Sequence, residues 1–423
     1  MQRRTRRATT AAALSLAMLP LAACGSDSGD DGSVELTVAT FSDFGYEALV
    51  DEYEADHPGV TVTIQVSQFE QHHQQLTTQL AGGSGAADIV AVEEGWMPRF
   101  RESKDRFANL ADHGGAGLQD RWLPWKWEQG VLDDGAFVMG YGTDVGSLAM
   151  CYRRDMFEAA GLPTDREEVG ALWPTWDDYF AAGREFLDSG ADAAWFDGAD
   201  TIYSSMLNQS EIGYFDRDET FVGDSNPVVE DAFLAVGAAV EDGMSAGLVG
   251  FSQEWNVGFK QSSFATAPCP SWALGLIQDA AGEEAAGLWD VAAVPGGGGN
   301  WGGSFLTVPA QGDHQAEAAE LAAWLTAPEQ EKRIFQDVGS LPSIPALYED
   351  PAVSDFTNPY FNDAPVGQIF ASSAAELQPN FRGVRDSEVR PVFGSALQRV
   401  EQGNASPADA FAEAVEEAAG AVD

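Results

Sequence analysis

The sequence predicts an α/β protein of at least two lobes, and three observations support this fold class. Strand and helix patterns alternate between residues 34 and 92, as in a parallel sheet covered by helices. A turn-rich segment at 141–146 interrupts that alternation, and a new strand follows it. A glycine-rich stretch at 295–309, with strand-like sequence on both sides, predicts a crossing back between lobes. The 423 residues, 44% of them apolar, can bury a large core and suggest two or three lobes.

The first predicted lobe begins with three strands. Residues 34–40 alternate with period two, residues 60–66 are rich in β-branched side chains, and residues 87–92 are mostly apolar. Helices are expected between the strands, one from about residue 46 to the stop at His57-Pro58-Gly59 and one near 69–80. Ligands of parallel sheets bind beyond the carboxyl ends of the strands, which here are residues 41–44 and 93–96.

The second predicted lobe follows the turn-rich segment. A strand is expected at 147–152 and a helix at 155–160, and Thr175 has the pattern of a helix N-cap. Helices are also expected at 316–325, from Pro328 to near Gly339, and from Ser406-Pro407 to the C-terminus. Residues 340–345 predict one more crossing of the chain between the two lobes.

The glycine-rich stretch is also a predicted ligand contact. Six glycines between residues 296 and 303 leave backbone amides and carbonyls unshielded by side chains, and Trp301 presents an aromatic face among them. A sugar suits such a surface, because its C–H face stacks on an indole while its hydroxyls bond to amides. A flexible linker is the alternative, and the tryptophan and the flanking strands argue against it.

The N-terminus predicts export and a lipid anchor. Four arginines between residues 3 and 7 precede an apolar run at 8–21, which is typical of a secretory signal and short for a membrane span. Leu21-Ala22-Ala23-Cys24-Gly25 resembles a bacterial lipobox. We therefore expect a signal peptide at 1–23, lipidation of Cys24, and a flexible tether at 24–33. Such a chain is exported and anchored to the outer face of the cytoplasmic membrane.

Charge and cysteine content narrow the function and predict one covalent link. Removal of residues 1–23 leaves 18 basic and 67 acidic residues, a formal charge of −49, which excludes nucleic acid as a partner. The acidic residues are scattered, as on a solvated surface. Cys151 and Cys269 are the cysteines that remain after Cys24. In an exported chain such a pair favours a disulfide over two free thiols.

Several motifs resemble, in their order, those of family 1 extracellular solute-binding proteins, the sugar-capturing lipoproteins of ABC importers. The likeness runs from about residue 34 to the C-terminus. The motifs are Ala87-Asp88-Ile89-Val90, Tyr141-Gly142-Thr143-Asp144, Tyr152-Arg153-Arg154-Asp155-Met156-Phe157-Glu158-Ala159-Ala160-Gly161-Leu162, Thr175-Trp176-Asp177-Asp178 and Gly339-Ser340-Leu341-Pro342.

The resemblance implies a two-lobed, periplasmic-binding-protein-like fold of type II, with three crossings and a ligand cleft between the lobes. The first lobe would comprise residues 34–143 and 304–342, and the second 144–303 and 343–423. The implied protein is a monomeric, non-enzymatic receptor without cofactor or metal. It would deliver a di- or oligosaccharide to the transmembrane subunits of an ABC permease. The resemblance also places Cys151 and Cys269 on strands of the second lobe.

Sugar binding requires flat apolar faces and polar groups that form paired hydrogen bonds with hydroxyls. Loop or strand-end placement favours Trp255, Trp272 and Trp301 as stacking residues, whereas Trp122, Trp125 and Trp127 crowd together as packing residues usually do. The polar candidates are Glu94, Asp144, Asp197 and Arg382. Phe41 and Gly303 complete the expected ligand-binding set, at the end of the first strand and at the second crossing.

Other function classes fit the sequence less well. A carbohydrate-active enzyme needs two carboxylates roughly 5 to 10 Å apart, whereas Glu93 and Glu94 are adjacent and would point apart in an extended chain. A metal site is disfavoured because His72 and His73 lack the i, i+4 spacing. A binding protein for a polyamine or peptide stays open, since this acidic chain could supply carboxylates around aromatic rings.

Overall fold

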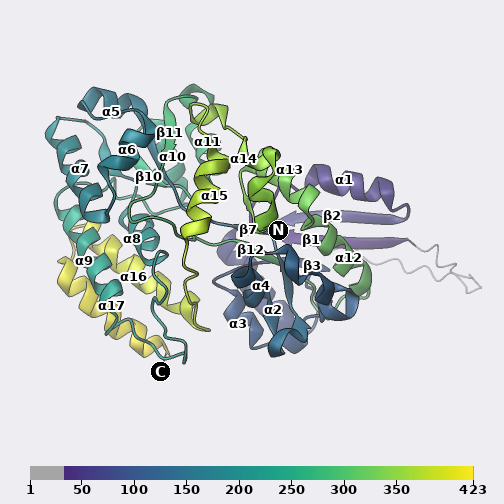
Figure 1. The fold of residues 1–423 in the computed structure, drawn as a ribbon. Helices are drawn as coiled ribbons and strands as arrows, with labels where there is room; N and C mark the ends of the chain where they lie inside the picture. Colours follow the sequence, from purple (N-terminus) through teal and green to yellow (C-terminus); the bar gives the residue numbers. More distant parts are fainter. Residues whose placement is uncertain (1–32, 423) are drawn as a thin grey trace, which may run out of the picture. The chain divides into compact units, whose positions relative to one another are not determined.

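The structure is a computed structural model that describes residues 33–422. Residues Val34–Asp423 form one unit by their internal contacts, coloured from purple to yellow in Figure 1. The predicted signal peptide, Cys24 and all but the last residue of the predicted tether lie outside the described residues. Within residues 33–422, no helix has both the length and the apolar character needed to cross a membrane.

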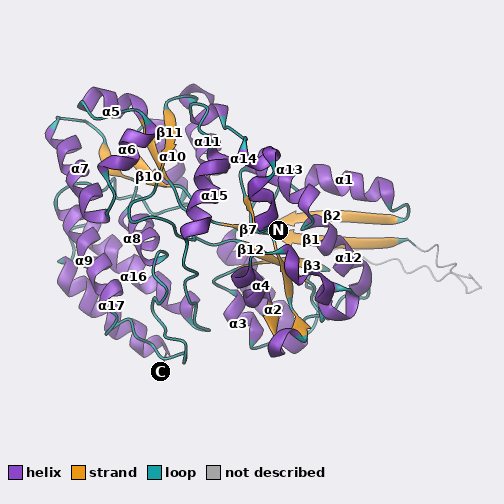
Figure 2. Ribbon diagram, viewed as in Figure 1, coloured by secondary structure: helices purple, strands orange, loops and turns teal. Residues whose placement is uncertain are grey.

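A five-stranded mixed sheet contains the first strands of the chain, drawn in orange in Figure 2. Its order is β2-β1-β3-β12-β6, with bounds Val60–Val66, Val34–Thr40, Ile89–Glu93, Ser304–Thr307 and Gly140–Gly142. β1 runs parallel to β2 and β3, while β12 is antiparallel to β3 and β6. The first two strands have the predicted bounds, and the third begins two residues later than predicted.

Six helices belong to the chain segments that contribute to this sheet. Leu49, Val50 and Tyr53 of the first helix are buried at the predicted helical spacing. The helices are α1 (Glu47–Asp56), α2 (Phe69–Gly82), α3 (Met97–Arg101), α4 (Pro124–Gly130), α12 (Gln315–Leu325) and α13 (Pro328–Val338). The short strands β4 (Val131–Leu132) and β5 (Phe137–Val138) pair with each other.

A second, four-stranded sheet has the order β11-β8-β10-β9, with bounds Trp289–Ala292, Met150–Arg153, Phe264–Pro268 and Ala194–Phe196. β8 is antiparallel to β10 and β11, and β9 is parallel to β10. The strand predicted at 147–152 begins only at Met150, because Ser147 and Leu148 pair instead with the glycine-rich stretch at Asn300 and Gly299.

Helices make up most of the remaining chain. Thr175 caps its helix as predicted, accepting a hydrogen bond from Asp178 N at 3.2 Å, and Ser406 does the same for Asp409 N. The helices are α5 (Arg154–Ala160), α6 (Arg166–Leu172), α7 (Trp176–Asp188), α8 (Ala199–Leu207), α9 (Pro227–Glu241), α10 (Gln253–Gln261), α11 (Ala273–Ala281), α14 (Pro351–Ser354), α15 (Val366–Glu376), α16 (Asp386–Glu401) and α17 (Pro407–Val422). In Figure 1 the yellow helices α16 and α17 lie beside α9, with which both are in contact.

Two chain segments connect the two sheets, and a third segment packs against the first of them. The first runs from β6 to β8 through β7 (Asp144–Val145), and the second runs from β11 to β12. The third contains β13 (Leu341–Pro342), which pairs with β7. Asp144 Oδ1 accepts a hydrogen bond from Ser304 N at 2.9 Å, and Ser343 Oγ donates to Thr143 O at 3.2 Å. The first segment is therefore bound to each of the other two.

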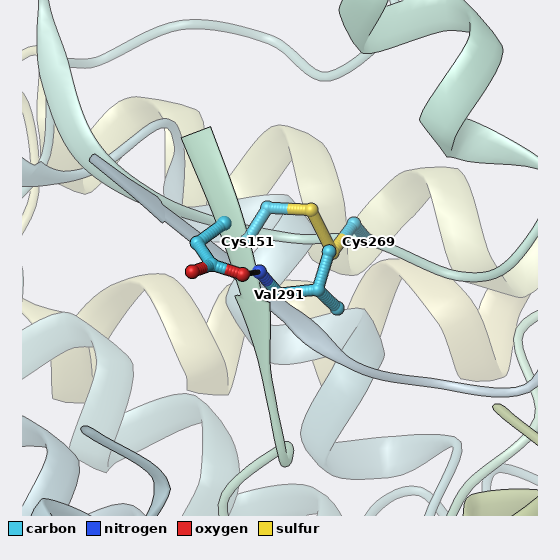
Figure 3. Close-up of a disulfide and its surroundings, with 4 residues drawn as sticks. Cys151, Cys269 and Val291 are labelled. Atoms are coloured by element: carbon cyan, nitrogen blue, oxygen red, sulfur yellow. Dashed lines mark hydrogen bonds between the residues drawn. A yellow bond between two sulfur atoms is a disulfide. The ribbon is translucent and has the colours of Figure 1, made fainter. Parts of the chain in front are cut away.

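The predicted disulfide is present. Cys151 on β8 bonds Cys269, the residue after β10, and their Cα atoms lie 5.7 Å apart, inside the range that a disulfide spans (Figure 3). Both residues are fully buried. Val291, drawn beside the bridge, is opposite Cys151 on the neighbouring strand β11. The bridge thus links two adjacent strands directly before the segment that carries Trp272.

We predict that replacing both cysteines, Cys151→Ala with Cys269→Ala, lowers the free energy of unfolding by about 4 to 5 kcal/mol. The bond joins residues 118 positions apart in the sequence. It restricts the conformations of the unfolded chain, so its loss raises the conformational entropy of the unfolded state. Urea unfolding of the variant and of wild type measures the difference. Unchanged midpoints and slopes would contradict this role for the bridge.

Candidate ligand-binding site

The glycine-rich stretch packs its backbone against the first connection. The carbonyls of Gly299, Gly302 and Gly303 accept hydrogen bonds from the amides of Leu148, Gly146 and Glu94, at 2.9 to 3.2 Å. These three carbonyls are therefore bonded within the protein, and the prediction that amides of the stretch bind a ligand stays a prediction. A Cβ at Gly146 would lie 1.9 Å from Trp301 O, so glycine is required for this close approach.

Three aromatic side chains from three segments meet at this connection. Trp272 Nε1 donates a hydrogen bond to Trp301 O at 2.7 Å, and the two rings are nearly perpendicular, with centroids 6.4 Å apart. The ring of Phe251 lies 5.5 Å from Trp272 and 5.8 Å from Trp301, and 46% of this residue is exposed. We call Phe251, Trp272 and Trp301 the aromatic cluster.

Phe251 has a strained backbone. Its φ of 62° lies in the left-handed region, which bulky side chains rarely adopt. Such strain persists only where the surroundings enforce it, and it concentrates at functional sites. Here it holds a large apolar ring in solvent contact beside two half-buried tryptophans, Trp272 and Trp301.

Glu93, at the end of β3, lies beside the aromatic cluster. Its Oε2 accepts a hydrogen bond from Gly95 N at 2.8 Å. A Cβ placed on Gly95 would be 2.9 Å from both Glu93 Oε2 and Arg390 Nη2, so these two charged groups flank the same glycine. A Cβ placed on Gly302 would be 3.3 Å from Glu93 Oε1 and 3.9 Å from Trp272 Nε1. The carboxylate therefore sits between Arg390 and Trp272.

Glu94 points away from Glu93, as expected for neighbouring residues in an extended chain. It is buried, its Oε1 accepts a hydrogen bond from Asn300 Nδ2 at 2.7 Å, and its Oε2 lies 3.6 Å from Lys126 Nζ. Burial raises the pKa of Glu94 to about 7, although Lys126 opposes the shift. Of the two glutamates, Glu93 is the one that adjoins the aromatic cluster.

Arg382 belongs to a buried group of alternating charges. Asp386 is fully buried and accepts hydrogen bonds from Arg382 at 3.4 Å and from Arg390 at 2.9 Å. Arg382 also donates to Asn208, while its Nε has no partner. Glu93, Glu94 and Asp386 lie among Lys126, Arg382 and Arg390, and each of these acids interacts with at least one of the three bases.

Asp197 and Trp255 lie in the interior and hold each other. Trp255 Nε1 donates to Asp197 Oδ2 at 2.7 Å, and Thr201 Oγ1 donates to Asp197 Oδ1 at 2.6 Å. Trp255 is 2% exposed and lies within α10, so its predicted loop position is wrong. Burial raises the pKa of Asp197 to about 7. The ring centroids of Trp255 and Phe251 are 5.1 Å apart, so Trp255 packs against the buried side of the aromatic cluster.

The other expected residues occupy two places. Asp144 and Gly303 join the connections, and a Cβ on Gly303 would lie 2.5 Å from Asp144 O. Phe41 is half-buried and packs its ring 5.2 Å from those of Phe69 and His73.

Two surface hollows, one beside Glu241 and Asn404 and one along α10, include none of the residues expected to bind the ligand.

A family profile described as "Bacterial extracellular solute-binding protein" matches residues 43–332. The chain belongs to this family. The solute-binding protein is 47% identical to a solved structure described as extracellular solute-binding protein family 1, with a TM-score of 0.83 over 92% of this chain and 100% of that one. The family consists of exported binding proteins rather than enzymes, so this solute-binding protein is not catalytic.

More distant relatives are informative about the fold. The solute-binding protein is 25% identical over 354 residues to the arabinooligosaccharide-binding protein of Bacillus subtilis (strain 168), with 77% of each chain covered. It also matches the ABC transporter associated binding protein from B. animalis subsp. lactis Bl-04 in complex with β-1,6-galactobiose. That match has 21% identity and a TM-score of 0.78, covering 91% of this chain and 96% of the other.

Sequence reasoning missed several residues of the site. Phe251 lies in a turn after Gly250 and belongs to no periodic pattern, so only its backbone strain distinguishes it. Arg390 lies within a helix, and its proximity to Glu93 depends on the packing of α16. The choice between Glu93 and Glu94 required the strand register, which fixes which carboxylate faces the aromatic cluster.

We predict that Trp255→Ala lowers the free energy of unfolding of the solute-binding protein by about 3 to 5 kcal/mol. The substitution empties a buried site and leaves Asp197 Oδ2 without its donor. Urea unfolding measures the loss, and Val257→Ala, an exposed position on the same helix, serves as the control. A Trp255 variant as stable as this control would contradict an interior role.

Proposed function

We propose that this solute-binding protein captures a di- or oligosaccharide and delivers it to the permease subunits of an ABC importer. The observation that carries the proposal is the aromatic cluster with the Glu93 carboxylate beside it. An indole face packs against the C–H face of a sugar ring, while a carboxylate accepts hydrogen bonds from neighbouring hydroxyls.

The pairing of charges favours a neutral ligand over a polyamine. A polycation requires free carboxylates, whereas Glu93, Glu94 and Asp386 each interact with an arginine or lysine of the protein. Buried charges that are already paired with protein partners offer little net attraction to a charged ligand. They present fixed donors and acceptors, which suit hydroxyl groups.

In this proposal the sugar lies between two lobes that close on it, with the lobes comprising residues 34–143 plus 304–342 and 144–303 plus 343–423. Glu93 then comes from the first lobe, Phe251, Trp272 and Arg390 from the second, and Trp301 from a connection. Arg99 of α3 and Glu388 of α16 form an ion pair at 2.9 Å, a contact of the kind that closure would make. Arg382 completes the polar side of the site.

The ligands of relatives support a sugar as the ligand. Two relatives are arabinooligosaccharide-binding proteins, and solved proteins of the same fold are complexes with β-1,6-galactobiose, cycloalternan and maltose. We further propose that the protein acts as a monomer anchored through lipidated Cys24 to the outer face of the cytoplasmic membrane. This anchor keeps the captured ligand near the permease.

We predict that an oligosaccharide raises the melting temperature of the protein, because a ligand that binds only the folded state stabilises it. Arabinotriose, β-1,6-galactobiose and maltose are tested at equal concentration, with spermidine as the charged control. Chromatography of the mixture afterwards is expected to recover the sugar unchanged. A shift with spermidine but with none of the sugars would contradict the proposal, and release of monosaccharide would contradict a pure receptor.

We predict that Trp272→Ala raises the dissociation constant of the bound sugar at least thirtyfold, the equivalent of about 2 kcal/mol of lost stacking. Isothermal titration measures the affinity, and thermal unfolding of the ligand-free variant measures stability. Trp324→Ala, which removes another half-buried indole from α12, is the matched control. A Trp272 variant that is destabilised yet binds normally would remove this side chain from the site.

A further inference from the structure

The side chains of His72 and His73 form hydrogen bonds with the backbone at the C-terminal end of β3, beyond the residues of β3 that pair with β1. The paired residues are Val38 with Ile89 and Ala39 with Val90. Beyond them, Ala91 O accepts a hydrogen bond from His72 Nε2 at 2.7 Å, and Glu93 N donates to His73 Nε2 at 3.1 Å.

The two imidazoles occupy the positions of a missing backbone partner. In a parallel pair, one residue bonds the carbonyl before and the amide after the residue that it faces. If the register continued, Phe41 would face Val92 and would bond Ala91 O and Glu93 N. β1 ends at Thr40 instead, and the ring of Phe41 packs 5.5 Å and 5.2 Å from the two histidine rings.

We propose that His72 and His73 substitute for the backbone of Phe41 and that His73 is a positioning residue for Glu93. The amide of Glu93 is held by His73, and its carboxylate is held by the amide of Gly95. The inference rests on the proposed function in one respect, namely that Glu93 is taken to face the ligand. It also explains why the segment after β1 can leave the sheet without unpairing β3.

The hydrogen bonds require opposite tautomers of the two neighbouring histidines. A carbonyl oxygen only accepts, so His73 Nδ1, which lies 2.8 Å from Phe69 O, carries the proton and Nε2 is left as the acceptor. His72 must carry its proton on Nε2, which donates to Ala91 O. Burial lowers the pKa of His73 to about 3, which is consistent with a permanently neutral ring.

Packing fixes the orientation of His73. The residue is fully buried and its ring stacks on that of Trp96, with centroids 4.9 Å apart and planes 13° from parallel. A phenylalanine at this position would keep the stacking and lose both hydrogen bonds. A glutamine would place an amide oxygen near the position of Nε2 and could restore the bond to Glu93 N.

The test uses the ligand-free protein, so it is independent of which sugar binds. Nitrogen-15 NMR of the histidine rings is expected to show neutral His73 protonated at Nδ1 and neutral His72 protonated at Nε2. In His73→Phe the Glu93 amide is expected to exchange with solvent more than tenfold faster, and in His73→Gln the protection is expected to return. The opposite tautomer at His73, or equal protection in His73→Phe, would overturn the proposal.

Ligand affinity distinguishes positioning from stability. For a sugar from the panel that binds wild type, His73→Phe is expected to weaken binding about tenfold, the effect of one lost hydrogen bond. His72→Phe is the matched control, because it removes a hydrogen bond to the carbonyl of Ala91, two residues from Glu93. The affinity of this variant for the sugar is expected to stay within about threefold of wild type. Equal weakening in both variants would assign both histidines to stability alone.

Discussion

The structure depends on the close packing of three chain segments, the two that connect the sheets and the one that contains β13. Glycines at positions 146 and 303 allow the first two connections to approach until their backbones bond directly, and any side chain there would collide with a neighbouring carbonyl. Asp144 and Ser343 add hydrogen bonds between the segments. This packing fixes Trp301 relative to Trp272, and it places the aromatic cluster beside the end of β3.

Burial of charge is the second constraint on the site. Removing a carboxylate from water is costly unless partners replace its hydration, and the structure supplies those partners in alternation. Asp386 has two arginines, Glu94 has Asn300 and Lys126, and Glu93 has Gly95 and Arg390. The arrangement holds polar groups rigidly around an apolar surface, and a rigid mixture of this kind lowers the entropic cost of binding a polar ligand with flat faces.

Local sequence patterns predicted strands β1, β2, β3 and β8, several of the helices, the caps at Thr175 and Ser406, and the disulfide, since each depends on neighbouring residues or on cysteine number. They did not predict which side chains of the second sheet reach the aromatic cluster. Trp255 and Trp272 both lie near glycine or proline, but Trp255 is a buried residue of α10 and Trp272 adjoins Trp301, a difference that tertiary packing alone creates. Phe251 and Arg390 were missed for the same reason.

We propose that a sugar ring packs on the aromatic cluster and forms a hydrogen bond with Glu93. A crystal structure with the sugar that gives the largest thermal shift is the most direct test. We expect a sugar face against the indole of Trp272 or Trp301 and a hydroxyl within hydrogen-bonding distance of Glu93. A sugar bound elsewhere, for example in the hollow beside Glu241 and Asn404, with no contact to the cluster, would contradict it.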